Sequence, residues 1–250
     1  MRVDRKSFST VKIGITAAFM ALVCVSTMIF SIYVPATRGY FNIGEAMVYT
    51  TALLFGPVIG AVAGGVGSAL ADAILGYWIY APATLLIKAC EGAVVGLLGL
   101  KIVNIGSTKR WRFFTIAIGL LIASLIGYIG TRLYTGVVEA SIGLPLFGYY
   151  TLSANIPTIF WIGVMLLIVA IITYIGLLSH PRVGWMVFSM LLGGMIMVSG
   201  YFLYEWTLYG AAALVEIPVN IGQSVIGILI ATPLVKAISR RVPWIRERFQ

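Results

Sequence analysis

The chain has 250 residues, of which 60% are hydrophobic and only 10% are charged, and its mean hydropathy is +1.03. Because a soluble domain carries about 25% charged residues, this composition excludes an ordinary soluble protein and predicts an all-α protein that crosses a membrane several times. The net charge of +9 does not indicate nucleic acid, since the Lys and Arg residues gather at the chain ends and in short loops between apolar runs.

The first predicted span runs from about Val11 to Tyr33 and stops before Pro35. Ala17 and Ala21 are four residues apart, so they lie on one face of this helix. Small residues at that spacing let another helix approach closely. The spacing alone fits packing within the chain and docking of a separate subunit equally well.

Residues 34–43 are expected to form a loop. Two apolar stretches follow, at about Gly44–Phe55 and Val58–Leu75, and Gly56-Pro57 joins them. The next outer loop, GYWIYAP, carries three aromatic residues that suit either the membrane interface or a ligand lid.

The fourth predicted span covers about Ala81–Val103 and contains Lys88 and Glu91, three residues apart on one helix face. Lys88 lies about 10 Å into this helix at 1.5 Å per residue, too deep for an exposed end. The pair has two interpretations: an internal ion pair that holds helices together, or two polar contacts for a substrate.

Four further spans are predicted, at about Phe113–Val137, Ala154–Leu178, Trp185–Trp206 and Ala213–Ile238. With eight spans, the basic loops 104–112 and 179–184, the N-terminus and the basic tail 239–250 fall on one side of the membrane. The positive-inside rule then places both termini in the cytoplasm of a protein in the cell membrane. We treat residues 1–250 as a single membrane domain.

Charged groups within spans are costly and usually face a protein interior or a wet cavity. The outer halves of the predicted spans hold several such groups together with amides and aromatics, so we expect one outward-facing pocket. Its candidate residues are Asn42, Glu45, Asp72, Tyr77, Trp78, Tyr80, Glu205, Glu216, Asn220 and Gln223, with Lys88 and Glu91 as a possible floor. Glu139 and Asn155 fall at the same level.

Several chemistries are missing from the sequence. It has no phosphate-binding GxxxxGK[ST] loop, so the chain does not use ATP by itself, and it has no HExxH motif. Cys24 and Cys90 lie in apolar runs and the single His180 lies in a basic loop, so neither a disulfide nor a metal site is indicated. We therefore expect no catalytic residues, metal or cofactor.

The stretch from Asn42 to Gly99 resembles the substrate-binding S component of energy-coupling factor (ECF) transporters, in the riboflavin-transporter-like branch. The matching motifs are Gly44-Glu45, the run from Gly56-Pro57 to Asp72, and the helix from Pro82-Ala83-Thr84 through Lys88, Glu91 and Gly92. EIPVNIGQSVIG looks like the family's last helix, where Asn220 and Gln223 match substrate-contacting positions. Ala17 and Ala21 look like the alanine motif that docks S components on the coupling subunit.

The resemblance implies a protein that binds a vitamin-like small molecule and pairs with a transmembrane coupling subunit and two ATPase subunits. Riboflavin-, thiamin- and pyridoxine-like molecules all fit an acid-rich pocket, which disfavours anions. S components usually have six helices, so residues 113–178 are interpreted as an inserted helix pair. Two other functions stay open: a proton-coupled secondary transporter, and a membrane enzyme that acts on lipid.

Overall fold

The computed structural model describes residues 5–99, 108–133, 135–144, 148–178 and 181–242. Within these ranges the chain forms α1 (Arg5–Ile29), β1 (Ser31–Val34), β2 (Gly39–Asn42), α2 (Glu45–Phe55), α3 (Pro57–Leu75), α4 (Ala81–Gly99), α5 (Thr108–Leu133), β3 (Gly136–Leu144), β4 (Gly148–Ile156), α6 (Thr158–Leu178), α7 (Pro181–Tyr209), the short 3-10 helix η1 (Gly210–Ala212) and α8 (Ala213–Arg241).

Four helical stretches of the described chain are long and apolar enough to cross a membrane. They are Thr10–Ile29, Pro57–Leu75, Ala81–Gly99 and Val183–Arg241, the last of which contains both α7 and α8. α2 and parts of α5 and α6 are apolar but shorter. The mainly helical, apolar architecture agrees with the predicted membrane protein, whereas the number of crossings stays a prediction.

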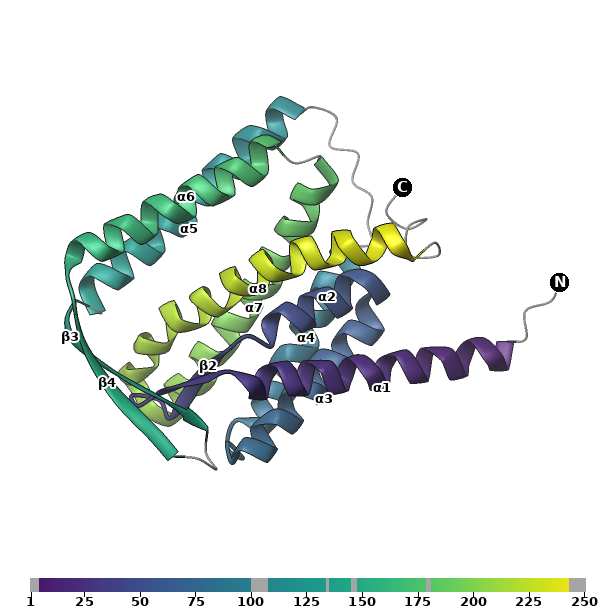
Figure 1. Cartoon of the computed structure of the whole chain (residues 1–250), viewed down its shortest axis with the longest axis horizontal. Coiled ribbons are helices and arrows are strands. Elements are labelled where there is room, and N and C mark those ends of the chain that lie inside the picture. Colours follow the sequence, from purple (N-terminus) through teal and green to yellow (C-terminus); the bar gives the residue numbers. More distant parts are fainter. Residues whose placement is uncertain (1–4, 100–107, 134, 145–147, 179–180, 243–250) are drawn as a thin grey trace.

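Helices α2, α4, α7 and α8 surround the main hydrophobic core, with α1 and α3 packed beside them (Figure 1). Tyr49 of α2 and Met190 of α7 are fully buried in this core. The predicted break between the second and third apolar stretches is confirmed: α2 ends at Phe55 and α3 begins at Pro57. Gly56 has φ 89°, which glycine adopts readily, and proline is favoured in the first turn of a helix.

Glycines bring α3 and α4 into backbone contact. A Cβ atom added at Gly60 would lie 2.8 Å from the carbonyl oxygen of Gly92, and one added at Gly65 would lie 2.7 Å from the carbonyl oxygen of Leu85. Small residues at such positions let helices approach closely within a membrane. This contact fixes the spacing of two helices that carry pocket residues.

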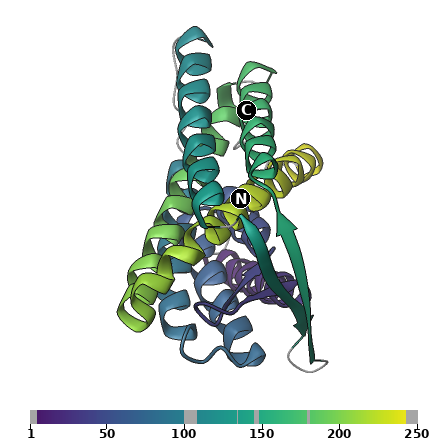
Figure 2. The same ribbon diagram turned by 90° about the vertical axis from the view of Figure 1, so that its left-hand side faces the viewer.

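The segment between α4 and α7 differs from its prediction. The fifth span was expected to reach Val137 and the sixth to begin at Ala154, but β3 and β4 form an antiparallel hairpin between α5 and α6. α5 also begins at Thr108, within the predicted loop 104–112. The two helices pack against each other along one edge of the molecule (Figures 1 and 2). The two predicted spans extend into the ends of these strands because hydropathy alone does not separate an apolar strand from an apolar helix.

A four-stranded antiparallel sheet lies at the end of the bundle where α1 ends (Figure 1), in the order β2-β1-β3-β4. The first span was predicted to reach Tyr33 and residues 34–43 to be a loop, but α1 ends at Ile29 and residues 31–42 form the β1–β2 hairpin. β1 pairs with β3 through Ile32–Ile142 and Tyr33–Ser141. The β3–β4 hairpin therefore extends the sheet that begins next to α2.

Candidate functional site

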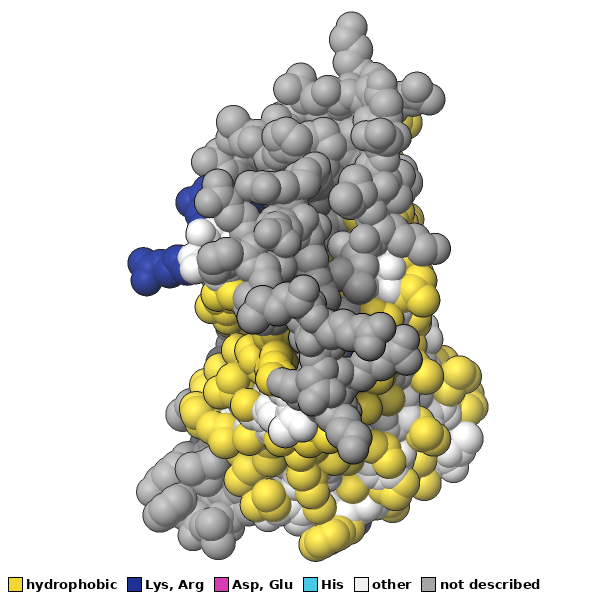
Figure 3. All heavy atoms as spheres, turned by 90° about the vertical axis from the view of Figure 1, so that its right-hand side faces the viewer, with side chains coloured by type: hydrophobic (Ala, Val, Ile, Leu, Met, Phe, Trp, Pro, Cys, Tyr) yellow, Lys and Arg dark blue, Asp and Glu magenta, His cyan; other side chains and the backbone are white. Residues whose placement is uncertain are grey.

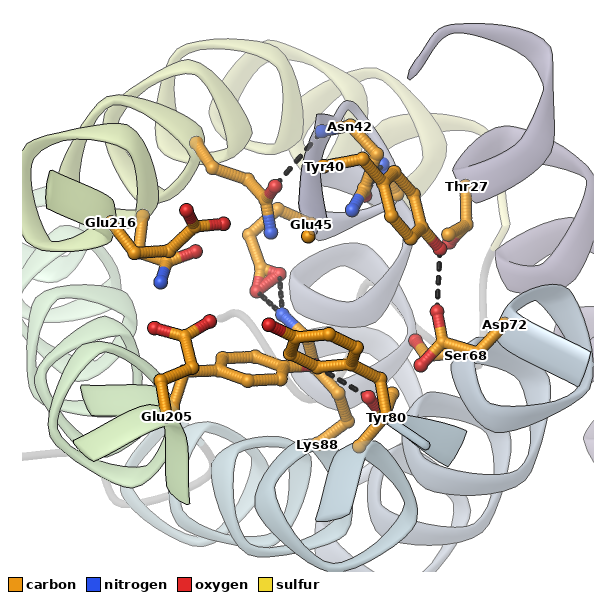
Figure 4. Close-up of a pocket in the computed structure, with 16 residues that line it drawn as sticks. Thr27, Tyr40, Asn42, Glu45, Ser68, Asp72, Tyr80, Lys88, Glu205 and Glu216 are labelled. Atoms are coloured by element: carbon orange, nitrogen blue, oxygen red, sulfur yellow. Dashed lines mark hydrogen bonds and ion pairs between the residues drawn. The ribbon is translucent and has the colours of Figure 1, made fainter. Parts of the chain in front are cut away.

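A small, polar pocket lies under the β1–β2 hairpin, where α1, α2, α3, α4, α7 and α8 converge (Figure 4). Its cavity measures about 30 Å³, room for only one or two water molecules. The lining residues are Thr27, Gly39, Tyr40, Asn42, Gly44, Glu45, Ser68, Asp72, Tyr80, Thr84, Lys88, Tyr201, Glu205, Glu216, Asn220 and Gln223.

A buried lysine forms one side of this pocket. Lys88 Nζ, only 4% exposed, donates hydrogen bonds to both carboxylate oxygens of Glu45, at 2.6 Å for Oε2. Glu91 Oε2 lies 3.2 Å from the same nitrogen and forms an ion pair with it. Glu45 occupies the first turn of α2, where the partial positive charge of the helix N-terminus stabilises an anion. The ion pair between Lys88 and Glu45 therefore connects α4 with α2.

The β1–β2 hairpin is tied to the helices by three polar contacts. Tyr40 donates a 2.6 Å hydrogen bond to Asp72 of α3, and Thr37 donates one of 2.6 Å to Glu216 of α8. The backbone N–H of Asn42 donates to Gln223 Oε1 at 2.9 Å. Burial and the neighbouring Asp72 carboxylate raise the pKa of Tyr40 well above its usual value, so its phenol keeps the proton that it donates.

Tyrosines fill much of the remaining space. Tyr80, just before α4, donates a 2.7 Å hydrogen bond to the carbonyl oxygen of Thr37. This bond is a further contact between the hairpin and the helical bundle. The ring of Tyr40 stacks on Tyr77 with centroids 4.5 Å apart. Tyr201 of α7 donates to Thr84 of α4 at 2.9 Å. Aromatic walls with a few placed polar groups are typical of small-molecule sites.

Polar atoms without a hydrogen-bond partner also face the pocket. Among the described residues, these include Ser68 Oγ, Asp72 Oδ2 and Glu205 Oε2. All three side chains belong to residues that are at most 3% exposed. Because an unsatisfied buried polar group costs about 1–3 kcal/mol, such atoms indicate positions where a ligand or water can bind.

The structure brings most of the predicted site residues together. Those that line the pocket are Asn42, Glu45, Asp72, Tyr80, Lys88, Glu205, Glu216, Asn220 and Gln223. Glu91 and Tyr77 are not among the lining residues: Glu91 is fully buried and forms an ion pair with Lys88, and the ring of Tyr77 stacks on Tyr40. Trp78 is 70% exposed and does not line the pocket. Asn155 is exposed on β4, and the side chain of Glu139 lies outside the described part of the structure.

Several lining residues were not predicted, namely Thr27, Tyr40, Ser68, Thr84 and Tyr201. Hydroxyl-bearing residues are common in membrane helices, so their types alone give no signal. For two of these lining residues, however, the spacing gives a signal. Thr84 lies four residues before Lys88 and Ser68 lies four residues before Asp72, so each shares a helix face with a charged residue. Tyr40 could not be placed without the hairpin.

The described parts of α5 and α6 do not line the pocket. Among the described residues, this segment is connected to the β1–β2 hairpin above the site by the pairing of β3 with β1. The interpretation of residues 113–178 as an inserted pair stays a prediction.

Comparison with known proteins identifies the family. Residues 7–175, about two thirds of the chain, match the model of the ECF-type riboflavin transporter S component. The match covers α1 from residue 7 onward and all of α2, α3 and α4, so it includes the pocket-lining residues from Thr27 to Lys88. Members of this family are substrate-binding components of transporters rather than enzymes.

A curated relative from Pyrococcus woesei, named "Uncharacterized protein in gap 3'region", is 49% identical over 84 residues. The alignment covers 34% of this chain and 56% of the relative, so the chain spans just over half the length of that protein. The family match, together with the multi-pass helical architecture, shows that this chain belongs to the S component family of ECF-type riboflavin transporters.

Proposed function

We propose that the chain captures a vitamin or vitamin-like molecule on the outer side of the cell membrane and delivers it through ATP-driven uptake by a separate module. The observation that carries this proposal is the convergence of buried polar side chains from both halves of the sequence on one pocket in an otherwise apolar bundle. Burying so many polar groups is costly and serves no purpose in a simple membrane anchor.

The distribution of basic residues supports an outward-facing pocket. α1 begins and α8 ends at the same end of the bundle, opposite the sheet (Figure 1). Lys12, Lys236, Arg240 and Arg241 lie at that end, and the described side chains on this face are mainly hydrophobic with Lys and Arg among them (Figure 3). By the positive-inside rule this end faces the cytoplasm. The proposed eight crossings agree with this orientation, because an even number of crossings places both termini on the same side.

The β1–β2 hairpin is proposed as the lid of the pocket. A cavity of about 30 Å³ cannot hold a vitamin, because small-molecule pockets typically measure about 300–1,000 Å³. The hairpin is held over the helices by hydrogen bonds from Thr37, Tyr40 and Asn42 and by the one that Tyr80 donates to Thr37, while β1 also pairs with β3. Breaking these bonds would free Asp72, Glu216 and Gln223, which then contact the substrate together with Asn220 and Lys88.

The proposed partners are a transmembrane coupling subunit and two ATPase subunits. Ala17 and Ala21 of α1 are both exposed, and a Cβ atom added at the neighbouring Gly14 would meet no atom within 4 Å. This small-residue face of α1 is free to receive another helix from the coupling subunit.

Uptake in cells tests this proposal against its rivals. The chain is produced in cells with the coupling subunit and ATPases, and with ATPases whose phosphate-binding lysine is replaced. We expect uptake of the substrate only with active ATPases. Uptake that persists without ATP hydrolysis would instead indicate a proton-coupled secondary transporter. Chemical turnover of a bound lipid, lost in Glu45→Gln while binding is kept, would indicate an enzyme.

A further inference from the structure

Two buried carboxylates face each other across the pocket. Glu205 comes from α7 and Glu216 from the first turn of α8, and Figure 4 shows both carboxylates pointing into the cavity and toward one another. They are 1% and 3% exposed. Two like charges at such a site repel one another unless a positive charge or a proton lies between them.

The other carboxylates of the pocket have partners of their own. Glu45 is paired with Lys88, and Asp72 accepts the hydrogen bond of Tyr40. Lys88 is the only cationic side chain among the described lining residues, and its nitrogen already forms ion pairs with Glu45 and Glu91. The pair Glu205–Glu216 is therefore left without a cation from the described chain.

The remaining hydrogen bonds do not satisfy this pair. Glu216 Oε2 accepts from Thr37, but Glu205 Oε2 has no hydrogen-bond partner among the described residues. The N-terminus of α8 favours a negative charge on Glu216, which lies in its first turn. A group that carries positive charge and N–H donors would satisfy both carboxylates at once.

We propose that the substrate carries a cationic nitrogen group, such as an ammonium or an amidine, and that this group binds between Glu205 and Glu216. The inference rests on the proposed function and narrows its substrate class. A neutral ring of the substrate then extends toward the tyrosines and toward Asp72 and Ser68, whose free oxygen atoms accept or donate further hydrogen bonds. Anionic molecules are excluded because they would meet the carboxylates.

Binding to the purified full-length protein tests this inference. Isothermal titration calorimetry is run in detergent with two cationic probes, thiamin and pyridoxamine, and two neutral probes, riboflavin and pyridoxine. Pyridoxamine and pyridoxine differ only in an amine that replaces a hydroxyl group. We expect the tightest probe to be cationic, and pyridoxamine to bind at least tenfold more tightly than pyridoxine.

Substitution of the two glutamates tests whether they cause the preference for cationic probes. Glu205→Gln keeps the size of the side chain and should weaken the tightest cationic probe at least tenfold, while Trp78→Phe, at an exposed position outside the pocket, should not. Glu216→Gln provides a second variant if Glu205→Gln does not fold, as judged by its melting temperature, and should weaken the same probe similarly.

The outcomes separate this inference from the proposed function. If riboflavin or pyridoxine binds most tightly, or if both glutamine variants keep the affinity for the cation within twofold, the cation site is wrong and the vitamin-binding function stands. If none of the four probes binds, the cation site is overturned, and the vitamin-binding function is overturned as well if a broad vitamin panel also fails to bind.

Discussion

Lys88 of α4 donates hydrogen bonds to both carboxylate oxygens of Glu45 at the start of α2, and both residues are almost completely buried. The sequence offered Glu91, on the same helix, as the partner of Lys88. The structure keeps Glu91 as a second ion-pair partner at 3.2 Å and adds Glu45 from a helix 43 residues earlier in the chain. The triad therefore joins two helices and also forms part of the pocket wall.

The first prediction concerns this triad. Glu45→Gln leaves Lys88 with Glu91 as its only charged partner, and removing one member of a buried pair costs about 3–5 kcal/mol. We expect Glu45→Gln and Lys88→Met each to lower the melting temperature in detergent. The double variant should lose less than the sum of the two single losses, because the loss of the Lys88–Glu45 pair is then counted once and only Glu91 keeps an unpaired charge. Strictly additive losses would show that the two residues do not interact.

The second prediction concerns the hairpin. Tyr40→Phe removes the hydrogen bond to Asp72 but keeps the ring that stacks on Tyr77. A hydrogen bond to a charged group is worth about 1.5–3 kcal/mol, so the closed hairpin should open more readily and the ligand should bind about tenfold faster. Tyr128→Phe, at an exposed position on α5, serves as the control. Unchanged association in Tyr40→Phe, measured by stopped-flow fluorescence, would show that this hydrogen bond does not hold the hairpin closed over the pocket.

The third prediction concerns the contact between α3 and α4. Gly60→Ala would place a methyl group 2.8 Å from backbone atoms of both Ala52 and Gly92. Because neither backbone can move independently, we expect a loss of about 1–3 kcal/mol in stability. Gly163→Ala on α6 meets no atom within 4 Å and should leave the melting temperature unchanged or raise it. Equal melting temperatures for the two variants would contradict this packing.

The fourth prediction concerns docking. Ala17→Trp with Ala21→Trp fills the small-residue face of α1 and should prevent assembly with the coupling subunit while ligand binding is kept. Leu22→Trp is the matched control, because Leu22 is 47% exposed and lies about 100° around the helix from Ala21. Co-purification with the coupling subunit measures assembly. Normal assembly of the double variant would place the interface elsewhere.

The charged residues of the site could be predicted because charged residues are rare in apolar helices. Glu45, Asp72, Glu205 and Glu216 occur in stretches where any charge is costly, so their types alone indicate a buried site. Their partners required the fold. The pairing of Lys88 with Glu45 depends on how α2 packs against α4, which no local spacing reveals.

The hairpins could not be predicted from hydropathy. β1 follows α1 after a single residue and continues its apolar pattern, so hydropathy predicts a helix that extends to Tyr33. The predicted spans reach only the outer ends of β3 and β4, at residues 136–137 and 154–156, and the pattern predicts no element for residues 138–153 between them. Trp78 was included as an aromatic residue of an outer loop, and only the turn between α3 and α4 shows that it faces outward.

Ligand binding by the isolated protein tests the central claim most directly. The purified chain is examined by native mass spectrometry for a molecule that co-purifies with it, and the affinity of that molecule is then measured by calorimetry for the wild type and for Asn220→Leu, which removes an amide from the pocket wall. We predict one tightly bound vitamin-like molecule that the variant binds at least tenfold more weakly. No co-purifying molecule and no binding across a broad vitamin panel, or equal affinity in the variant, would contradict the assignment of this pocket as the substrate site.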